Sequence, residues 1–203
     1  MVLFINVLLS SIIQIFIVGI IPFIWWIVTK RKQERFFDWI GLKKIPKEQI
    51  KKTIYSTFIV IISFLLLSIY MQIITKDISK STSQFKGLEF NGFIPALIYS
   101  FIQTAFTEEL LFRGFILKRI KNKFGFKIAN IIQSLLFALM HCFMFVTLTN
   151  IFNVIFITLF TGLNALAMGY LNEVKADGSI YPSWFIHGIS NIFACIITLF
   201  NII

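Results

Sequence analysis

The run VLFINVLLSSIIQIFIVGIIPFIWWIV at residues 2–28 has no charged side chain and is long enough to cross a bilayer as one helix. The hydrocarbon core of a bilayer is about 30 Å thick, which takes roughly 20 apolar residues. The run has no basic residues before it, is longer than the apolar core of a signal peptide, which has about 7–15 residues, and precedes no small-x-small cleavage site. We therefore interpret it as a retained first span.

Five more apolar segments follow, and together they predict an all-α polytopic membrane protein, a bundle of about six transmembrane helices. The predicted spans are residues 2–28, 54–74, 93–117, 128–148, 151–171 and 182–202. Hydrophobic residues make up 58% of the chain and charged residues 14%, with a mean hydropathy of +0.86, which excludes an ordinary soluble domain. The two cysteines, Cys142 and Cys195, lie in apolar runs without metal-ligand spacing and are predicted to be free thiols.

The net charge of +10 comes mainly from two basic loops, so the lipid bilayer and not nucleic acid is the expected partner. Successive loops carry nine, three, five, no and one Lys or Arg residue, in residues 30–52, 75–92, 118–127, 149–150 and 172–181. The positive-inside rule then predicts that the first, third and fifth loops are cytoplasmic and that both termini are outside. The first loop forms an amphipathic helix at the membrane interface, an extension of the cytoplasmic end of the first span, or a plain solvated connector.

Only five acidic, basic or histidine side chains lie within the predicted spans. They are Glu108, Glu109, Arg113, His141 and His187. Ionisable groups are costly to place in lipid, so residues of this kind are functional candidates by default. Their concentration predicts a small polar site inside the bilayer.

The spacing of these residues predicts two sets with different surroundings. Glu109 and Arg113 are i,i+4 on one helix and are expected to pair, whereas Glu108 points about 100° away and is expected to stay free. His187 and Asn191 are also i,i+4, so both can face one cavity. Depths counted from the basic loops at about 1.5 Å per residue place the free carboxylate and the histidines between the cytoplasmic side and the midplane. This predicts a cavity that opens toward the cytoplasm.

A carboxylate beside two imidazoles in a dry cavity suits the activation of water. The carboxylate can act as general base, a neutral histidine can hold the water, and the second histidine and the asparagine amide can donate to an oxyanion. Glu108, His141 and His187 are equally the ligand types that zinc accepts while keeping one position open for water. A transporter or proton relay would bury similar groups, but it usually has inverted repeats and broken helices in matching halves, and neither is visible here.

Three segments resemble the motifs of the CPBP intramembrane proteases, also called the Abi or CAAX-protease family. Residues 108–113 (EELLFR) are similar to its EExxxR motif, residues 137–141 (FALMH) to its FxxxH motif, and residues 187–191 (HGISN) to its HxxxN motif. The resemblance extends over residues 93–203, which we take as a catalytic membrane core. Residues 1–92 are then an N-terminal two-helix membrane region with a basic cytoplasmic loop.

The resemblance implies an intramembrane endopeptidase of the cell membrane that acts on a membrane-associated protein or peptide. It implies that Glu108 and His141 activate water and that His187 and Asn191 form the oxyanion hole. It favours a glutamate-type mechanism without a cofactor over a zinc-dependent one. The implied role is bacteriocin self-immunity or peptide maturation.

The same resemblance gives Glu109 and Arg113 a supporting part in the site. A non-catalytic immunity or scaffold protein of the same fold is the alternative. A protein of that kind would be expected to lose motif residues, whereas this chain retains all of them. We therefore expect an enzyme.

Overall fold

Long helices dominate the computed structural model, which describes residues 1–76 and 78–203. Five helices are long and apolar enough to span a membrane. They are α1 (Val2–Thr29), α3 (Lys47–Ile74), α7 (Phe126–Phe145), α8 (Ile151–Tyr170) with its extension η5 (Leu171–Lys175), and α9 (Tyr181–Leu199). No β-strand occurs in the described residues, which confirms the predicted all-α polytopic membrane fold.

A sixth helical run connects Phe93 to Phe124 and changes its hydrogen-bonding pattern along its length. Its segments are α4 (Phe93–Ile98), η3 (Tyr99–Phe106), α5 (Thr107–Glu109), η4 (Leu110–Leu117) and α6 (Lys118–Phe124). Both η3 and η4 are π-helical, with i→i+5 bonding and therefore wider turns than an α-helix. Such segments are rare and occur frequently at functional sites. In this chain, η3 and η4 lie directly before and after the short segment α5, which contains Glu108 and Glu109.

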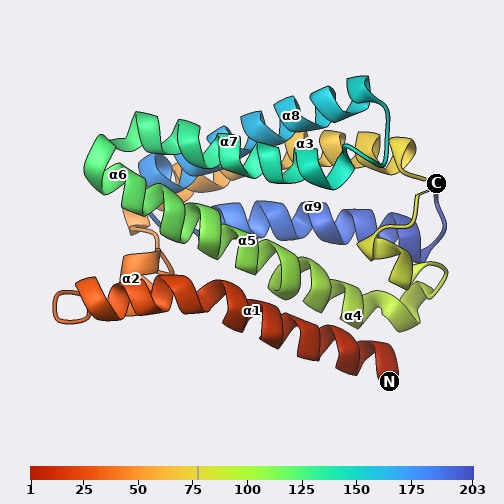
Figure 1. Ribbon diagram of the computed structural model, residues 1–203, viewed down its shortest axis with the longest axis horizontal. Helices are drawn as coiled ribbons and strands as arrows, with labels where there is room; N and C mark the ends of the chain where they lie inside the picture. The colour runs from red at the N-terminus through yellow and green to blue at the C-terminus, as the bar shows by residue number, and fades with distance from the viewer. Residues whose placement is uncertain (77) are drawn as a thin grey trace.

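The six runs alternate in direction, so the connections gather at two ends of the bundle (Figure 1). Both termini and residues 75–92, with the short helices η1 (Ser81–Phe85) and η2 (Glu89–Gly92), lie at what we call the terminal end. The opposite end holds α2 (Phe36–Ile40) and the turn between α6 and α7, and we call it the basic end. Helix α9 lies centrally and packs against α3 on one side and η3 on the other.

The helix bounds follow the predicted spans, with two clear exceptions. Helix α3 begins at Lys47 and not at residue 54, and the run predicted to end at residue 117 continues as α6 to Phe124, because basic turns continue both helices beyond their apolar runs. The predicted division of the chain after residue 92 falls at the end of η2 and remains a prediction. Since α3 packs against α9, the two predicted regions contact each other closely.

The outward faces of the bundle are apolar, as lipid-facing surfaces must be. On α1, the side chains of Ile13, Phe16 and Ile17 are each more than half exposed. An apolar surface of this extent is unusual for a soluble monomer and is normal for a helix in contact with lipid tails. Inside the bundle, Cys195 is buried and Cys142 half-buried, and both are free thiols as predicted.

The first basic loop forms a short helix that docks on the bundle. In α2, Trp39 and Ile40 are buried against Leu110 and its neighbours. A Cβ atom at position 114 would lie 2.8 Å from the carbonyl oxygen of Ile40, so Gly114 is needed for this close approach. A plain solvated connector is therefore wrong for residues 36–40, and the first span is not extended into the loop, because α1 ends at Thr29. The loop forms a separate helix of five residues.

Gly188 allows α9 to lie against the π-helical segment η3. A Cβ atom there would lie 2.3 Å from Cδ1 of the Phe101 ring. We expect Gly188→Ala to destabilise the protein by about 1–3 kcal/mol, because the ring and the helix must shift to admit the methyl group. The measurement is thermal unfolding in detergent. Gly19→Ala is the matched control, since nothing lies within 4 Å of the new atom; equal unfolding temperatures for both variants would contradict the prediction.

Candidate active site

A fully buried ion pair lies at the junction of α5 and η4. Arg113 NH1 donates to Glu109 Oε1 at 3.0 Å, and neither side chain is exposed. The Arg113 guanidinium also lies over the Phe137 ring, 4.3 Å from its centroid. The pair is the one that the i,i+4 spacing predicts, and pairing makes each buried charge far less costly than it would be alone.

The same carboxylate orients a histidine on α9. His187 Nδ1 lies 3.0 Å from Glu109 Oε1, so Nδ1 carries a proton and donates it to the carboxylate. A hydrogen bond at one ring nitrogen fixes what the other nitrogen can do. The Nε2 atom of His187 is therefore held toward Glu108, with 3.8 Å between Nε2 and Glu108 Oε2.

Glu108 differs from its neighbour in that it faces a cavity. Its side chain is 24% exposed, and its Oε2 atom has no hydrogen-bond partner among the described residues. Two carboxylates adjacent in sequence thus have separate environments: Glu109 is committed to Arg113 and His187, and Glu108 is available to a ligand. This is the division that the helix geometry predicts.

The second histidine is oriented by its own helix. His141 Nδ1 lies 3.0 Å from the carbonyl oxygen of Phe137, and a carbonyl can only accept, so Nδ1 carries the proton. The Nε2 atom of neutral His141 is then a free acceptor. The ring packs against Phe137, with 4.6 Å between ring centroids, which limits its rotation.

Asn191 lies one turn after His187 and is held by the π-helical segment. Its Nδ2 atom donates to Thr104 Oγ1 at 2.7 Å. The Thr104 hydroxyl in turn lies 3.0 Å from the Tyr99 carbonyl and 3.1 Å from the Ser100 carbonyl, five and four residues earlier. The amide has two N–H groups, so one remains for a ligand.

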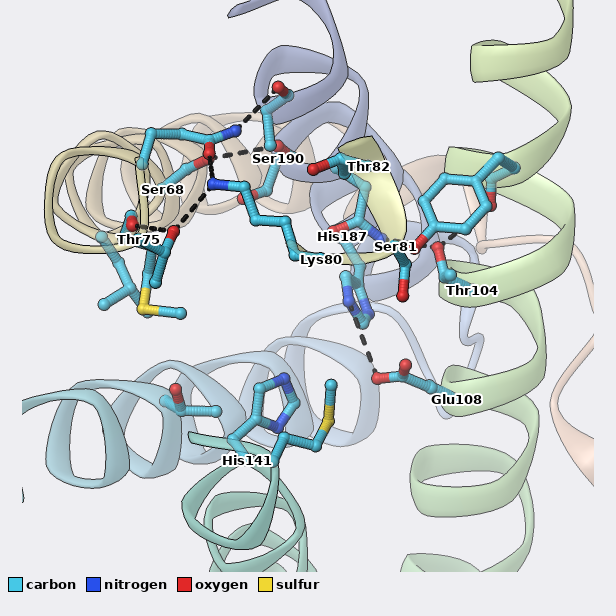
Figure 2. Close-up of a pocket in the computed structure, with 18 of the residues that line it drawn as sticks. Ser68, Thr75, Lys80, Ser81, Thr82, Thr104, Glu108, His141, His187 and Ser190 are labelled. Carbon is cyan, nitrogen blue, oxygen red and sulfur yellow. Dashed lines mark hydrogen bonds and ion pairs between the residues drawn. The ribbon is translucent and has the colours of Figure 1, made fainter. Parts of the chain in front are cut away.

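The side chains of Glu108, His141, His187 and Asn191 line one cavity of about 600 Å³. Figure 2 shows Glu108, His141 and His187 around the same hollow, on three different helices. Glu109 and Arg113 lie behind it and do not line it. The structure therefore brings together all four residues predicted to react and places the two predicted supporting residues next to them.

Sequence reasoning missed the contribution of α3. Ser68 and Gln72 line the cavity and are buried, and they donate to the carbonyl oxygens of Ser190 and Ala194 on α9. The prediction considered ionisable side chains within spans and, beside them, only Asn191. The sequence did contain a signal for this contribution. Ser68 and Gln72 are uncharged polar residues at i,i+4 in the span predicted at 54–74, and such residues often form hydrogen bonds between helices in membranes.

Lys80, in the connection after α3, lies at the mouth of the cavity. It donates hydrogen bonds to Gln72 Oε1 and, at 2.7 Å, to Thr75 Oγ1. Burial lowers the pKa of its ammonium group, because desolvation disfavours the charged form. The lining includes Lys80, Ser81 and Thr82, which belong to the terminal end. The predicted opening toward the cytoplasm stays a prediction.

The predicted zinc alternative uses Glu108, His141 and His187 as ligands. Among residues 1–76 and 78–203, no group of three or more His, Cys, Asp or Glu side chains is placed closely enough to hold a metal ion. The Nδ1 atoms of the two histidines bond to Glu109 and to the Phe137 carbonyl. Because a metal-ligating histidine is usually held by such a bond, with its other nitrogen left for the ion, these bonds do not decide the question. The zinc alternative stays a prediction.

A comparison with protein families gives one match. The family model described as type II CAAX prenyl endopeptidase Rce1-like matches residues 90–193, which is just over half of the chain. The matched range includes Glu108 to Arg113, His141 and His187 to Asn191. No curated protein and no solved structure matches the chain.

Proposed function

Because the chain belongs to the Rce1-like family of type II CAAX prenyl endopeptidases, we propose that it is an intramembrane endopeptidase acting on a membrane-associated protein or peptide. The observation that carries the proposal is the position of Glu108. Its side chain lines a cavity inside the bundle, and its Oε2 atom has no hydrogen-bond partner among the described residues. This oxygen lies 3.8 Å from Nε2 of His187, and the His187 ring is oriented by its hydrogen bond to Glu109.

In the proposed reaction, Glu108 and His141 hold and activate the attacking water. The water donates one hydrogen to the Glu108 carboxylate and the other to the free Nε2 of His141. Glu108 takes a proton as the oxygen attacks the scissile carbonyl, and the carboxylic acid then returns it to the leaving amine. A positioned general base typically accelerates such a step by about 10²–10⁴-fold.

His187 and Asn191 are the proposed donors to the oxyanion. Asn191 has an N–H group beyond the one bonded to Thr104. His187 donates from Nε2 only when both ring nitrogens are protonated. In that state two cations, Arg113 and His187, balance the two carboxylates Glu108 and Glu109. This local neutrality supports an imidazolium in the site, as the buried aspartate does in a Ser-His-Asp triad.

We propose that the mechanism is of the glutamate type and needs no metal. The Glu108 carboxylate supports it, because Oε2 has no hydrogen-bond partner among the described residues and can serve as the base. Location in the cell membrane and a role in bacteriocin self-immunity or peptide maturation are further proposals, supported by the resemblance of the three motif segments to the CPBP family.

The test is cleavage of a proteome-derived library of membrane peptides by the purified protein in lipid and detergent, with new termini identified by mass spectrometry. We expect cleavage by the parent that a chelator does not reduce, and loss of cleavage in His141→Ala. Cys142→Ala is the matched control, since Cys142 is the next residue on α7 and does not line the cavity. Chelator-sensitive cleavage restored by zinc would overturn the mechanism, and equal cleavage by both variants would overturn the site.

A further inference from the structure

A second cavity adjoins the catalytic cavity at the terminal end of the bundle. It has a volume of about 370 Å³ and is lined by the connection after α3 and by the end of α9. Gln72 and Lys80 line both cavities, so the two cavities meet at these side chains. Figure 2 shows Lys80 at the edge of the hollow around which Glu108 and His141 lie. A group bound in the second cavity would therefore lie beside a peptide bound at the catalytic residues.

Three lysines line this second cavity, and they are all the Lys and Arg residues of the connection at 75–92. They are Lys76, Lys80 and Lys86. Among the described residues, no Asp or Glu side chain lines the cavity, and its other polar side chains are hydroxyls and amides. A hollow lined by charges of one sign raises the local concentration of ligands of the opposite sign. The composition of the lining therefore favours an anionic ligand.

The ammonium group of Lys80 is held in place by two buried side chains at the end of α3. Among the described residues it donates to Gln72 Oε1 and, at 2.7 Å, to Thr75 Oγ1. The Gln72 amide is itself oriented, because its Nε2 atom donates to the Ala194 carbonyl on α9 at 2.7 Å. An ammonium group has three N–H groups, so these two bonds leave one for a ligand.

The surroundings of Lys80 hold its charge without neutralising it. Lys80 is half-buried, and desolvation lowers the pKa of its ammonium group. Its two partners are neutral, unlike the partner of Lys118 at the basic end, whose Nζ lies 2.8 Å from Glu173 Oε1. A hydrogen bond from an ammonium to an anion is shorter and stronger than one to a neutral acceptor. An anionic group beside Lys80 would therefore be stabilised.

We propose that Lys80, together with Lys76 and Lys86, binds a carboxylate of the substrate, carried by an acidic side chain or by a free C-terminus. The proposal rests on the proposed function and specifies its substrate class: apolar peptides with a carboxylate close to the scissile bond. A carboxylate held where the two cavities meet positions the adjoining peptide segment at Glu108 and His141. Lys80 is then a specificity-determining residue and takes no proton in the reaction.

Binding of short peptides tests this site without requiring cleavage. The probes are three labelled apolar peptides of one sequence: one with two aspartates and an amidated C-terminus, one with two asparagines and a free C-terminus, and one with two asparagines and an amidated C-terminus. The protein is held in nanodiscs of phosphatidylcholine, which carries no net charge. Fluorescence anisotropy gives the dissociation constants, and mass spectrometry then shows whether each peptide is intact.

We expect the parent to bind at least one carboxylate peptide about tenfold more tightly than the neutral peptide, the effect of one charge-assisted hydrogen bond. The peptide that gains affinity identifies the source of the carboxylate. Lys80→Gln should lose this preference. Lys44→Gln is the matched control and should keep it, because Lys44 is exposed at the basic end and lines neither cavity.

A second variant covers the case in which Lys80→Gln fails to fold. Lys86 is exposed, so folding should not depend on it, and Lys86→Gln should reduce the preference by about two- to fivefold. Equal affinities of the parent for all three peptides, binding of none of them, or a full preference in both variants would overturn the proposal. Carboxylate-dependent binding without cleavage of any peptide or of the membrane-peptide library would refute the protease and leave the site standing. Glu108-dependent cleavage without the preference would refute only the site.

Discussion

A Glu108→Gln variant is expected to fold like the parent and to hydrolyse peptide bonds about 10²–10⁴-fold more slowly. The amide keeps the size of the side chain and removes the base that accepts the proton from water. Folding should be unaffected, because Oε2 makes no hydrogen bond that the substitution would remove and lies 3.8 Å from His187 Nε2. The measurement is the initial rate of product formation on the first substrate identified, together with thermal unfolding in detergent.

Glu89→Gln is the matched control for this substitution. Glu89 is exposed in η2 and does not line the cavity, so the same chemical change there should leave the rate unaltered. A loss smaller than about tenfold in Glu108→Gln would contradict its role as general base. In that case His141 would be the group that accepts the proton from water.

Removal of the buried arginine is expected to have the largest effect on stability. In Arg113→Met the Glu109 carboxylate stays fully buried and loses its ion-pair partner, which typically costs about 3–5 kcal/mol. His187 would keep its hydrogen bond to Glu109, which does not replace the ion pair with Arg113. The variant is therefore expected to unfold at a much lower temperature in detergent, or to accumulate poorly in the membrane.

The double variant Arg113→Met with Glu109→Gln separates charge from packing. Since a buried ion pair is often replaceable by neutral groups of similar volume, the double variant should recover much of the lost stability. It should not recover activity, because the neutral amide no longer stabilises an imidazolium at His187. Arg35→Met, in the exposed pair with Asp38, is the control and should unfold like the parent. If the double variant were no more stable than Arg113→Met, the loss of stability would be due mainly to lost packing and not to the unpaired charge of Glu109.

Local geometry was predictable from the sequence to the extent that it depends on neighbours along one helix. The Glu109–Arg113 pair and the separate environment of Glu108 follow from spacing alone, because side chains four residues apart share a helix face. The contact between Glu109 and His187 joins residues far apart in the chain. This contact depends on how α9 packs against the helical run from Phe93 to Phe124. No local sequence pattern specifies that packing.

The position of the cavity along the bundle could not be obtained by counting residues, for a similar reason. Depths were counted along each helix as if all spans began at the same level and were α-helical throughout. The run through Glu108 contains two π-helical segments, and α9 starts at Tyr181 only after the connection of residues 176–180, in which all residues except Asp177 are buried. Counting residues therefore measured position along a chain and not position in the bundle.

The position of the lining also limits how a substrate can be handled. Among the described residues, the lining of the cavity reaches Lys80, Ser81 and Thr82 at the terminal end and includes no residue of the connections at the basic end. A polypeptide that enters at the terminal end does so as a bent loop or as a free end, and both fragments leave the way they came. Each cut thus requires dissociation before the next, so the expected pattern is one defined scission per encounter, with the departing fragment competing against fresh substrate.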